Sequence, residues 1–455
     1  MTSMIRIGNA QGFWGDSAGA PAKLVAQQPN LDFLTMDYLA EVSMSILAMQ
    51  MEKDPTKGYA DDFIDELRSL IPFWQKGAKF KVVANAGGLN PFGCADATAE
   101  ILKKAKLHNM KIGIVYGDDV ISILKEGDEF DNLDTGDKIK SVRESLVSAN
   151  AYLGAKPIVE ALEKGADIVI TGRTADPSLT VACCVHSYKW KWDDYDKLAS
   201  ATIAGHLIEC GAQVTGGIST NWLEIPDPIN IGYPVVEMHA DSSFAITKPA
   251  NTGGCVTEQT VKEQLLYEIG DPENYISPDV TVSFLNLKLE EEGKDRIKVT
   301  GAKGRPPPPT YKVSATYRDG YIAEGMLTLF GRHVHKKAHI CGEIVLQRVK
   351  NMGYSLEKSN VECIGSGDVV PGVIPNTPNW DLKECVLRIC VSDPRKEAVE
   401  CFAKELAPLV TSGAQGVTGY AGGRPKVRRV FGYWPCLIDV QRVEPAVEIM
   451  EVEGA

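Results

Sequence analysis

Short apolar segments alternate with amphipathic segments through the first part of the chain. Each apolar segment reads as a strand that ends in a polar or glycine-rich loop: "MIRIGNAQG", "LDFLTMDYLAE", "KFKVVANAGG", "KIGIVYGDD" and "ADIVITGRTAD". Between them, stretches such as "VSMSILAMQMEKD" and "ATAEILKKAKLHN" have a helical pattern. Strands that alternate with helices are typical of a parallel sheet covered on both faces. We therefore expect an α/β domain of this kind over residues 1–280.

The pattern changes near residue 280. The stretches "VTVSFLNLKLEEEGKDRIKVTGAKG" and "TYKVSATYRDGYIAEGMLTLFG" alternate as antiparallel hairpins, and Asp319-Gly320 has the composition of a hairpin turn. A helix around "CGEIVLQRVKNMG", a strand around "ECVLRICVSD" and a helix in "RKEAVECFAKELAPLV" follow. This order predicts a smaller α+β domain with antiparallel hairpins over residues 281–455.

Charge and composition exclude several classes of protein. The net charge of −12 argues against a general nucleic-acid-binding protein, which needs a basic face. No run approaches the ~20 apolar residues of a membrane helix, and "MTSMIRIGNA" lacks the features of a secretion signal. The 11 cysteines are scattered without a Cys-x-x-Cys motif, which favours reduced thiols. We expect a cytoplasmic homo-oligomer that binds a small molecule, without nucleic-acid or membrane partners.

Polar residues gather where the predicted strands end. In parallel sheets, ligands bind outside the carboxyl ends of the strands. Packing alone would require glycines there, but not so many polar groups. We therefore interpret this edge as a site in which Asp37, Asn85 and Arg173 share one pocket. The polar and flexible residues at the strand ends are Asn9, Gln11, Asp37, Glu41, Asn85, Gly87, Gly88, Asn90, Asp118, Asp119, Arg173 and Asp176.

The segment "TGRTADPSLT" follows one of these strands and carries Arg173 and Asp176. An arginine at a strand end can bind a carboxylate or a phosphate with two parallel hydrogen bonds. Asp176 would either orient Arg173 or exchange protons with a substrate. The alternative is a structural Arg–Asp pair that pins the loop.

A second candidate stretch is "AGHLIECGAQVTGG". His206, Glu209, Cys210 and Gln213 lie three, four and seven residues apart, so a helix would present them on one face. A His–Glu pair suits general acid/base catalysis, and Cys210 beside His206 would be a candidate nucleophile. The alternative is a partly buried polar stripe. We assign the catalytic role to four residues: His206, Glu209, Asp37 and Asp176.

Two Gly-Gly loops, in "VVANAGGLNP" and "ITKPANTGGCVT", are candidate anion sites. Glycines let backbone N–H groups approach a bound anion, and the second loop precedes a helix whose N-terminus favours negative charge. The alternative is that the glycines only permit tight turns. The expected substrate-binding residues are Asn9, Asn85, Gly87, Gly88, Asn90, Arg173, Lys248, Thr252, Gly253 and Gly254.

Signatures of metal and cofactor binding are weak or absent. His333 and His335 in "GRHVHKKAHICGE" would share one face of a strand and could bind a metal. Lys336 and Lys337 would repel a cation, however, and no carboxylate is close in sequence, so we assign no metal ligands. The chain has no His-Glu-x-x-His, no Walker A motif and no Gly-x-Gly-x-x-Gly after its first strand. No cofactor is expected.

Several long motifs resemble one family. They include "GNAQGFWGDS", "VVANAGGLNP", "NAYLGAKPIVEALEKGADIVITGRTADPSL", "GHLIECGAQVTGG" and "LAPLVTSGAQGVTGYAGGRPKVRRVFGYWPCLI". The chain resembles, nearly end to end, the acyclic terpene utilisation AtuA family. The resemblance implies a step in the breakdown of branched acyclic terpenoid acids as coenzyme A thioesters, but it supplies no catalytic residues.

This resemblance leaves three functions open. The leading one is a lyase or hydratase that acts by acid/base chemistry on a branched acyl-CoA or carboxylic acid, with coenzyme A entering only as part of the substrate. The second is a non-catalytic acyl-CoA-binding or accessory subunit that presents the thioester to a partner enzyme. The third is a metal-dependent hydrolase that uses His333 and His335.

Overall fold

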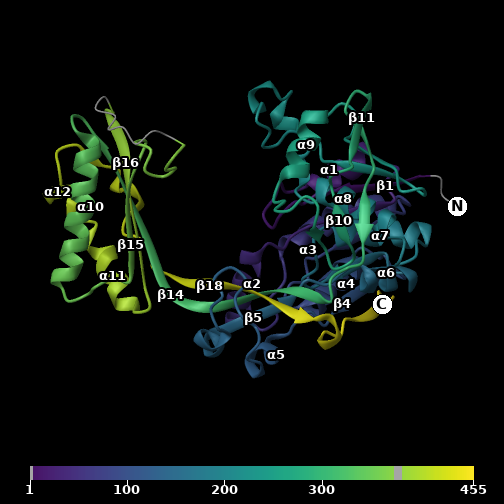
Figure 1. The fold of residues 1–455 in the computed structure, drawn as a ribbon, viewed down its shortest axis with the longest axis horizontal. Coiled ribbons are helices and arrows are strands. Elements are labelled where there is room, and N and C mark those ends of the chain that lie inside the picture. Colours follow the sequence, from purple (N-terminus) through teal and green to yellow (C-terminus); the bar gives the residue numbers. More distant parts are fainter. Residues whose placement is uncertain (1–3, 374–381, 455) are drawn as a thin grey trace. The chain divides into compact units, whose positions relative to one another are not determined.

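The chain folds into two compact units in the computed structural model, which describes residues 4–373 and 382–454 (Figure 1). Unit 1 comprises Met1–Thr316 and Tyr433–Ala455, and unit 2 comprises Tyr317–Gly432. Residues 281–316, which the sequence pattern grouped with the second domain, belong to unit 1. Unit 2 is therefore an insertion between two segments of unit 1.

A ten-stranded mixed sheet forms the centre of unit 1. Its five central strands, β1, β2, β3, β6 and β4, run parallel to one another in that spatial order. Antiparallel strands flank them on both sides. The predicted α/β class is thus confirmed. Across the sheet the strands are β11 (Lys288–Gly293), β12 (Arg296–Thr300), β8 (Phe244–Thr247), β7 (Val235–His239), β1 (Met4–Asn9), β2 (Phe33–Met36), β3 (Lys81–Ala84), β6 (Ile168–Thr171), β4 (Lys111–Tyr116) and β19 (Ala446–Glu451).

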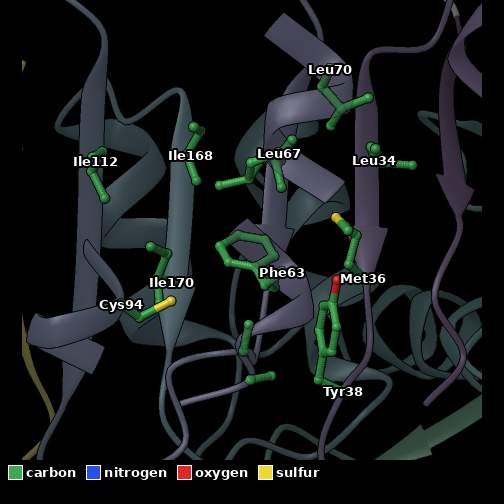
Figure 2. Close-up of a cluster of buried hydrophobic side chains, with 14 of the residues drawn as sticks. Leu34, Met36, Tyr38, Phe63, Leu67, Leu70, Cys94, Ile112, Ile168 and Ile170 are labelled. Atoms are coloured by element: carbon green, nitrogen blue, oxygen red, sulfur yellow. The ribbon is translucent and has the colours of Figure 1, made fainter. Parts of the chain in front are cut away.

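Helices cover both faces of this sheet. Because side chains alternate along a strand, Leu34 and Met36 of β2 point to one face, where they pack against Phe63 and Leu67 of α3 (Figure 2). Phe33 points to the other face and meets the ring of His186 in α7. The helices of unit 1 are α1 (Ala20–Gln27), α2 (Glu41–Lys53), α3 (Asp62–Gln75), α4 (Pro91–Lys104), α5 (Ile121–Glu126), α6 (Lys156–Glu163), α7 (Ser178–Tyr188), α8 (Tyr195–Ile208) and α9 (Glu258–Leu266).

The expected hairpin turn at Asp319-Gly320 is wrong. Strand β14 (Thr310–Phe330) continues through it and pairs with β16 (Glu384–Asp393) from Tyr321 onward. Gly320 has φ +87, and a Cβ there would lie 2.7 Å from the carbonyl oxygen of Asp393. The lack of a side chain at Gly320 therefore allows β14 and β16 to approach closely at this position. Near its start, β14 pairs with β5 (Leu146–Ala151), and a separate small sheet contains β13 (Lys303–Arg305), β10 (Thr281–Ser283) and β9 (Tyr275–Ile276).

Unit 2 is an antiparallel sheet that packs against helices (Figure 1). Its own buried cluster includes Leu329 and Ile389 from the sheet and Val345 and Phe402 from α10 and α11. An α+β arrangement with antiparallel strands was expected here. The remaining elements are β15 (Lys358–Ile364), β17 (Val417–Thr418), β18 (Arg428–Asp439), α10 (Val334–Asn351), α11 (Lys396–Glu405) and α12 (Leu409–Ser412).

The segment around His333 and His335 is helical, so the expectation of a strand there is wrong. Helix α10 begins at Val334, with His333 as its N-cap residue. The buried positions Val334, Ala338 and Cys341 recur three or four residues apart. This helical spacing outweighs the apparent alternation of the two histidines.

Two further observations concern the helices and the cysteine thiols. Within residues 4–373 and 382–454, none of the helices combines the length and apolar character needed to cross a bilayer. All 11 cysteines carry free thiols, as the scattered spacing indicated.

Candidate functional site

A cavity of about 490 Å³ opens in unit 1 beside the carboxyl ends of the parallel strands. Its lining comes mainly from the loops after β1 and β2, the loop after β6, and the segment that follows α8. The lining is strongly acidic. Six carboxyl groups contribute to it: Asp16, Asp37, Glu41, Asp176, Glu209 and Glu268.

A second cavity of about 400 Å³, also within unit 1, shares Glu41 and Asp176 with the first. Its lining differs in character because it contains two cationic side chains, Arg173 and Lys312. The rest of the wall is largely apolar or aromatic and includes Tyr152, Pro177, Ile276, Pro278, Tyr311 and Leu437. The two cavities together form an acidic chamber next to a cationic and apolar one, with Asp176 common to both.

Asn85 orients Asp37. The Asn85 amide is fully buried; its Nδ2 donates to Asp37 Oδ1 at 2.7 Å, and its Oδ1 accepts from the backbone N–H of Tyr38 at 2.7 Å. Burial and the neighbouring Asp176 raise the pKa of Asp37 well above its usual value, while Arg173 and Asn85 oppose this shift. Asn85 does not line either cavity, so its role in this geometry is to position Asp37.

Arg173 is buried beneath the smaller cavity and is largely bound by the protein itself. Its Nη1 donates to the carbonyl oxygen of Leu39 and, at 3.1 Å, to Asp176 Oδ1. Its guanidinium carbon lies 4.2 Å from the ring centroid of Tyr152. These contacts correspond to the structural Arg–Asp pair considered as an alternative. Arg173 Nε has no hydrogen-bond partner within the described residues, so one N–H donor of the guanidinium group is left unpaired.

Burial raises the pKa of Asp176 above its usual value, and the nearby Glu41 adds to this effect. The Arg173 guanidinium acts in the opposite direction. The side chain of Asp176 is 34% exposed, whereas that of Arg173 is 2% exposed. Asp176 is therefore the member of the pair that a bound molecule can reach.

Asp118 holds the backbone of the Arg173 loop in place. Its Oδ2 accepts hydrogen bonds from the backbone N–H of Arg173 and from Asn150 Nδ2, both at 2.8 Å. Burial raises the pKa of Asp118 to about 6, although these hydrogen bonds oppose the shift. Asp118 lines neither cavity and is thus a structural carboxyl group.

The hydrogen bonds of His206 fix the protonation of Glu209. His206 Nε2 lies 2.9 Å from the backbone oxygen of Gln264, which can only accept, so Nε2 carries the hydrogen. Burial lowers the pKa of His206 to about 4, and its neutral ring must accept at Nδ1. Glu209 Oε1 lies 3.0 Å from that nitrogen and must donate to it. With a neutral His206, Glu209 is the partner that carries the proton, which is the direction in which burial and Asp176 shift its pKa.

The helix end that carries Glu209 is anchored to strand β1. Asn9 Nδ2 donates to the carbonyl oxygens of Ile208 and Glu209 at 2.7 and 3.0 Å, and Asn9 Oδ1 accepts from Thr35 Oγ1 at 2.9 Å. These bonds satisfy carbonyl groups that a helix leaves unpaired at its C-terminus. Asn9 and His206 lie behind the cavity rather than in its wall, so both can act on a substrate only through Glu209.

Cys210 lines the larger cavity, but its surroundings suppress its reactivity. Burial raises its pKa, and the carboxyl groups of Glu209 and Asp37 raise it further. The nucleophile of cysteine chemistry is the thiolate. This geometry therefore does not favour the nucleophilic role considered for Cys210.

The loop with Gly87 and Gly88 is explained by packing. Three of its N–H groups are bonded internally: Gly87 to the carbonyl of Thr171, Leu89 to that of Gly58, and Asn90 to that of Gly87. A Cβ on Gly87 would lie 2.6 Å from Thr171 O. On Gly88, which has φ +53, it would lie 2.3 Å from Leu47 Cδ1. Asn90 caps α4 by accepting from the N–H of Gly93. None of Gly87, Gly88 and Asn90 lines the two cavities, and the expected anion contacts are not formed by these N–H groups.

The second Gly-Gly loop is also used internally. The N–H groups of Gly253 and Gly254 donate to the carbonyls of Asn230 and Pro226 at 2.8 and 2.7 Å. Lys248 Nζ lies 3.0 Å from the carbonyl oxygen of Thr252 and 3.2 Å from Asp295 Oδ2. The loop does not open a helix, because α9 begins four residues later at Glu258. Lys248, Thr252, Gly253 and Gly254 thus form a structural turn away from both cavities.

Among the lining residues that the sequence analysis missed are Asp16, Tyr152, Glu268 and Lys312. Asp16 follows β1 in "GNAQGFWGDS" and could have been included with the other polar residues at the strand ends. Tyr152 and Lys312 come together because β14 pairs with β5, and the backbone N–H of Tyr152 bonds the carbonyl of Lys312. Glu268 lies just after α9. No local pattern in the sequence indicates these three residues.

Comparison with known proteins identifies the family. The chain is an α/β protein with acidic groups gathered at the carboxyl edge of its sheet, and such a fold does not by itself define a chemistry. The model of the acyclic terpene utilisation family protein AtuA matches residues 5–449, so the chain belongs to the AtuA family, which the family name associates with acyclic terpene utilisation. Searches of curated proteins and of solved structures returned no match.

Proposed function

We propose that unit 1 is an enzyme of acyclic terpenoid breakdown that adds or removes water, or cleaves a bond next to a carbonyl, by acid/base chemistry. Its substrate is a branched terpenoid acid or the corresponding coenzyme A thioester. The observation that carries this proposal is the hydrogen bond between Glu209 and His206 beside a cavity that Glu209, Asp37 and Asp176 line. The pKa values of all three carboxyl groups are raised. A carboxylic acid that keeps its proton at neutral pH is suited to general acid catalysis.

The two cavities suggest how a substrate would be oriented. An anionic head group is repelled by carboxylates, so it belongs in the smaller cavity, where Lys312 is exposed and the buried Arg173 guanidinium adds positive charge. The apolar wall of that cavity suits the methyl branches of a terpenoid chain. Asp176 lines both cavities, and a substrate that extends from one to the other passes beside it. The reacting carbon would then lie between Asp176 and Glu209.

In the elimination direction, a carboxylate takes the proton from the carbon next to the carbonyl, and an acid donates a proton to the departing hydroxyl group. We assign the carboxylate role to Asp176, whose ionised form the Arg173 guanidinium favours, and the acid role to Glu209. A carbon–carbon double bond forms, the carbon–oxygen bond breaks, and water leaves. Addition of water is the reverse. Glu209 can regain its proton from solvent through the cavity.

The experiment compares Glu209→Gln with the wild-type protein. A glutamine amide still donates to His206 Nδ1 and preserves the hydrogen bond, but it cannot transfer a proton. We expect kcat for hydration or dehydration of branched unsaturated acids and their coenzyme A thioesters to fall about 10²–10⁴-fold. The melting temperature should change little.

Glu268→Gln provides the matched control, because it removes another carboxyl group from the same cavity and leaves both partners of the Glu209–His206 hydrogen bond in place. It should retain activity within a few-fold of wild type. Full activity of Glu209→Gln would overturn the assignment of the acid. If the wild-type protein binds the thioesters and turns over none of them, the protein is a non-catalytic binding subunit.

A further inference from the structure

Unit 2 contains a cluster of three side chains that does not belong to the site in unit 1. His335 and His339 lie one turn apart near the start of α10, and Asp368 lies in the turn after β15. The ligand-type atoms of the three residues all lie within 4.8 Å of one another. His339 Nε2 is 2.9 Å from Asp368 Oδ2, and His335 Nε2 is 3.6 Å from Asp368 Oδ1. Two ring nitrogens and a carboxylate therefore face a common point.

The carboxylate is held in place by its own turn. Asp368 Oδ2 accepts from the backbone N–H of Cys363 at 2.9 Å, and Oδ1 accepts from Ser366 Oγ at 2.8 Å. The side chain is only 15% exposed, so its orientation is set by these contacts. Such outer hydrogen bonds are typical of carboxylates that bind metals, because they fix the ligand before the ion arrives.

The spacing of the two histidines fits metal binding equally well. Residues four apart on a helix lie on the same face, and the two imidazole rings have centroids 4.7 Å apart. Their side chains are 36% and 35% exposed, which leaves access from solvent. Ligand bonds to zinc are about 2.0–2.2 Å long. Closing the cluster around an ion therefore needs only small side-chain rotations.

The lysines that appeared to disfavour a metal do not share this face. Lys337 Nζ donates to the carbonyl oxygen of Gln415 at 2.8 Å, which holds its charge at a different part of the unit. Lys336 is exposed and lies one position along the helix from His335, about 100° around its axis. His333, which the sequence paired with His335, is the N-cap residue and is not a member of the cluster.

We propose that His335, His339 and Asp368 bind a divalent transition-metal ion of the zinc type, through two imidazole nitrogens and one carboxylate. Two histidines and a carboxylate are the ligand set of zinc sites that keep a fourth position for water or another small ligand. The site is independent of the acid/base site assigned to unit 1. It ties the start of α10 to the turn after β15.

The test uses the full, untagged chain with ZnCl₂ as the probe, and binding is measured by competition with a chromophoric chelator. We expect one zinc ion to bind to the wild-type protein. His335→Ala, His339→Ala and Asp368→Asn should each weaken zinc binding at least about tenfold, the smallest effect typical even of residues that only support a metal ligand. Substituted cobalt should give a visible spectrum that the same variants lose.

The matched control is His333→Ala, which removes a neighbouring exposed histidine from outside the cluster and should bind zinc like the wild type. Melting curves recorded without metal show whether a variant is still folded, and so distinguish loss of a metal-binding side chain from loss of the fold. Zinc should raise the melting temperature of the wild type and of His333→Ala, but not that of His339→Ala. The proposal is overturned if the wild-type protein binds no zinc, or if folded His339→Ala and Asp368→Asn bind it as tightly as the wild type does.

Discussion

Two buried carboxyl groups, Glu209 and Asp118, show how different neighbours give the same acid different roles. Glu209 faces Nδ1 of His206, which is an acceptor when the ring is neutral and Nε2 donates to Gln264, so the proton of this hydrogen bond belongs to the carboxyl group. Asp118 accepts two hydrogen bonds on one oxygen, and these favour the ionised form that burial disfavours. The first arrangement favours a protonated Glu209 beside the larger cavity. The second uses Asp118 to hold the loop that carries Arg173.

Replacing Asp118 should change how stability depends on pH. Its pKa is raised from 3.8 to about 6 in the folded protein, so the folded state binds the proton more tightly than the unfolded chain. The stabilising contribution is complete below about pH 4 and is lost as the pH rises through 6. In Asp118→Asn this group no longer titrates. Relative to the wild type, its free energy of unfolding should therefore rise by roughly 2–2.5 kcal/mol between pH 4 and pH 7.

Urea unfolding of both proteins across this pH range measures the difference. The asparagine side-chain oxygen can take the place of Oδ2 and accept both existing hydrogen bonds. Asp119→Asn, at the exposed neighbouring position, is the control for removing a negative charge from this loop. A difference between Asp118→Asn and wild type that stays constant with pH would contradict the assignment.

At the scale of elements, the alternation of apolar segments was sufficient to predict the parallel strands and their shared edge. The strand ends at Asp37, Asn85 and Arg173 do come together, because parallel neighbours in one sheet end on the same side. What the sequence could not distinguish was whether each polar residue would face a cavity or bond to the protein. That choice depends on contacts between distant segments, such as Asn85 with Tyr38 and Asn9 with Glu209.

The errors in the sequence analysis arose from short patterns that overrode longer ones. Two histidines at alternate positions indicated a strand, whereas the buried residues from Val334 to Val349 follow a helical period. The Asp319-Gly320 dipeptide matched a hairpin turn, but it lies inside a strand of 21 residues. The carboxylate of the His335–His339 cluster is 29 residues beyond His339 in the chain, so no local motif could include Asp368.

The turn that follows β3 should be intolerant of any side chain at Gly88. This residue combines φ +53 with a Cβ position 2.3 Å from Leu47 Cδ1 and 2.9 Å from the carbonyl oxygen of Gly58. Gly88→Ala should lower the free energy of unfolding by more than the roughly 1–2 kcal/mol of left-handed backbone strain alone.

Gly77→Ala isolates the strain term, because Gly77 has φ +93 and no atom within 4 Å of its Cβ position. Chemical denaturation of both variants gives the comparison. Equal destabilisation of the two would mean that packing against Leu47 and Gly58 contributes nothing.

At the scale of the whole molecule, each unit has its own hydrophobic core. The core of unit 1 is centred on residues such as Phe63, Leu67 and Met36 (Figure 2), and that of unit 2 on residues such as Phe402, Val345 and Ile389. Chains with separate cores commonly depart from all-or-none unfolding. The candidate acid/base site and the proposed metal site are therefore supported by different cores.

We expect calorimetry to resolve these cores. Phe402 and Phe63 are both fully buried, and truncating a buried phenylalanine to alanine costs about 3–5 kcal/mol. Phe402→Ala should lower the temperature of one unfolding transition and leave the other in place, and Phe63→Ala should do the converse. If each variant shifts the entire heat-absorption profile in the same way, the two units unfold as one cooperative system.

The pairing of β19 with β4 has a consequence for synthesis of the chain. Strand β4 ends at Tyr116, whereas its antiparallel partner begins at Ala446, after all of unit 2 has been made. At about 5–20 residues per second, the nascent chain spends roughly 15–65 s with the open edge of β4 exposed. An unpaired edge strand is a template for intermolecular pairing. The ribosome-bound protein is thus most vulnerable to aggregation during this interval, and we expect chaperones to bind it mainly then.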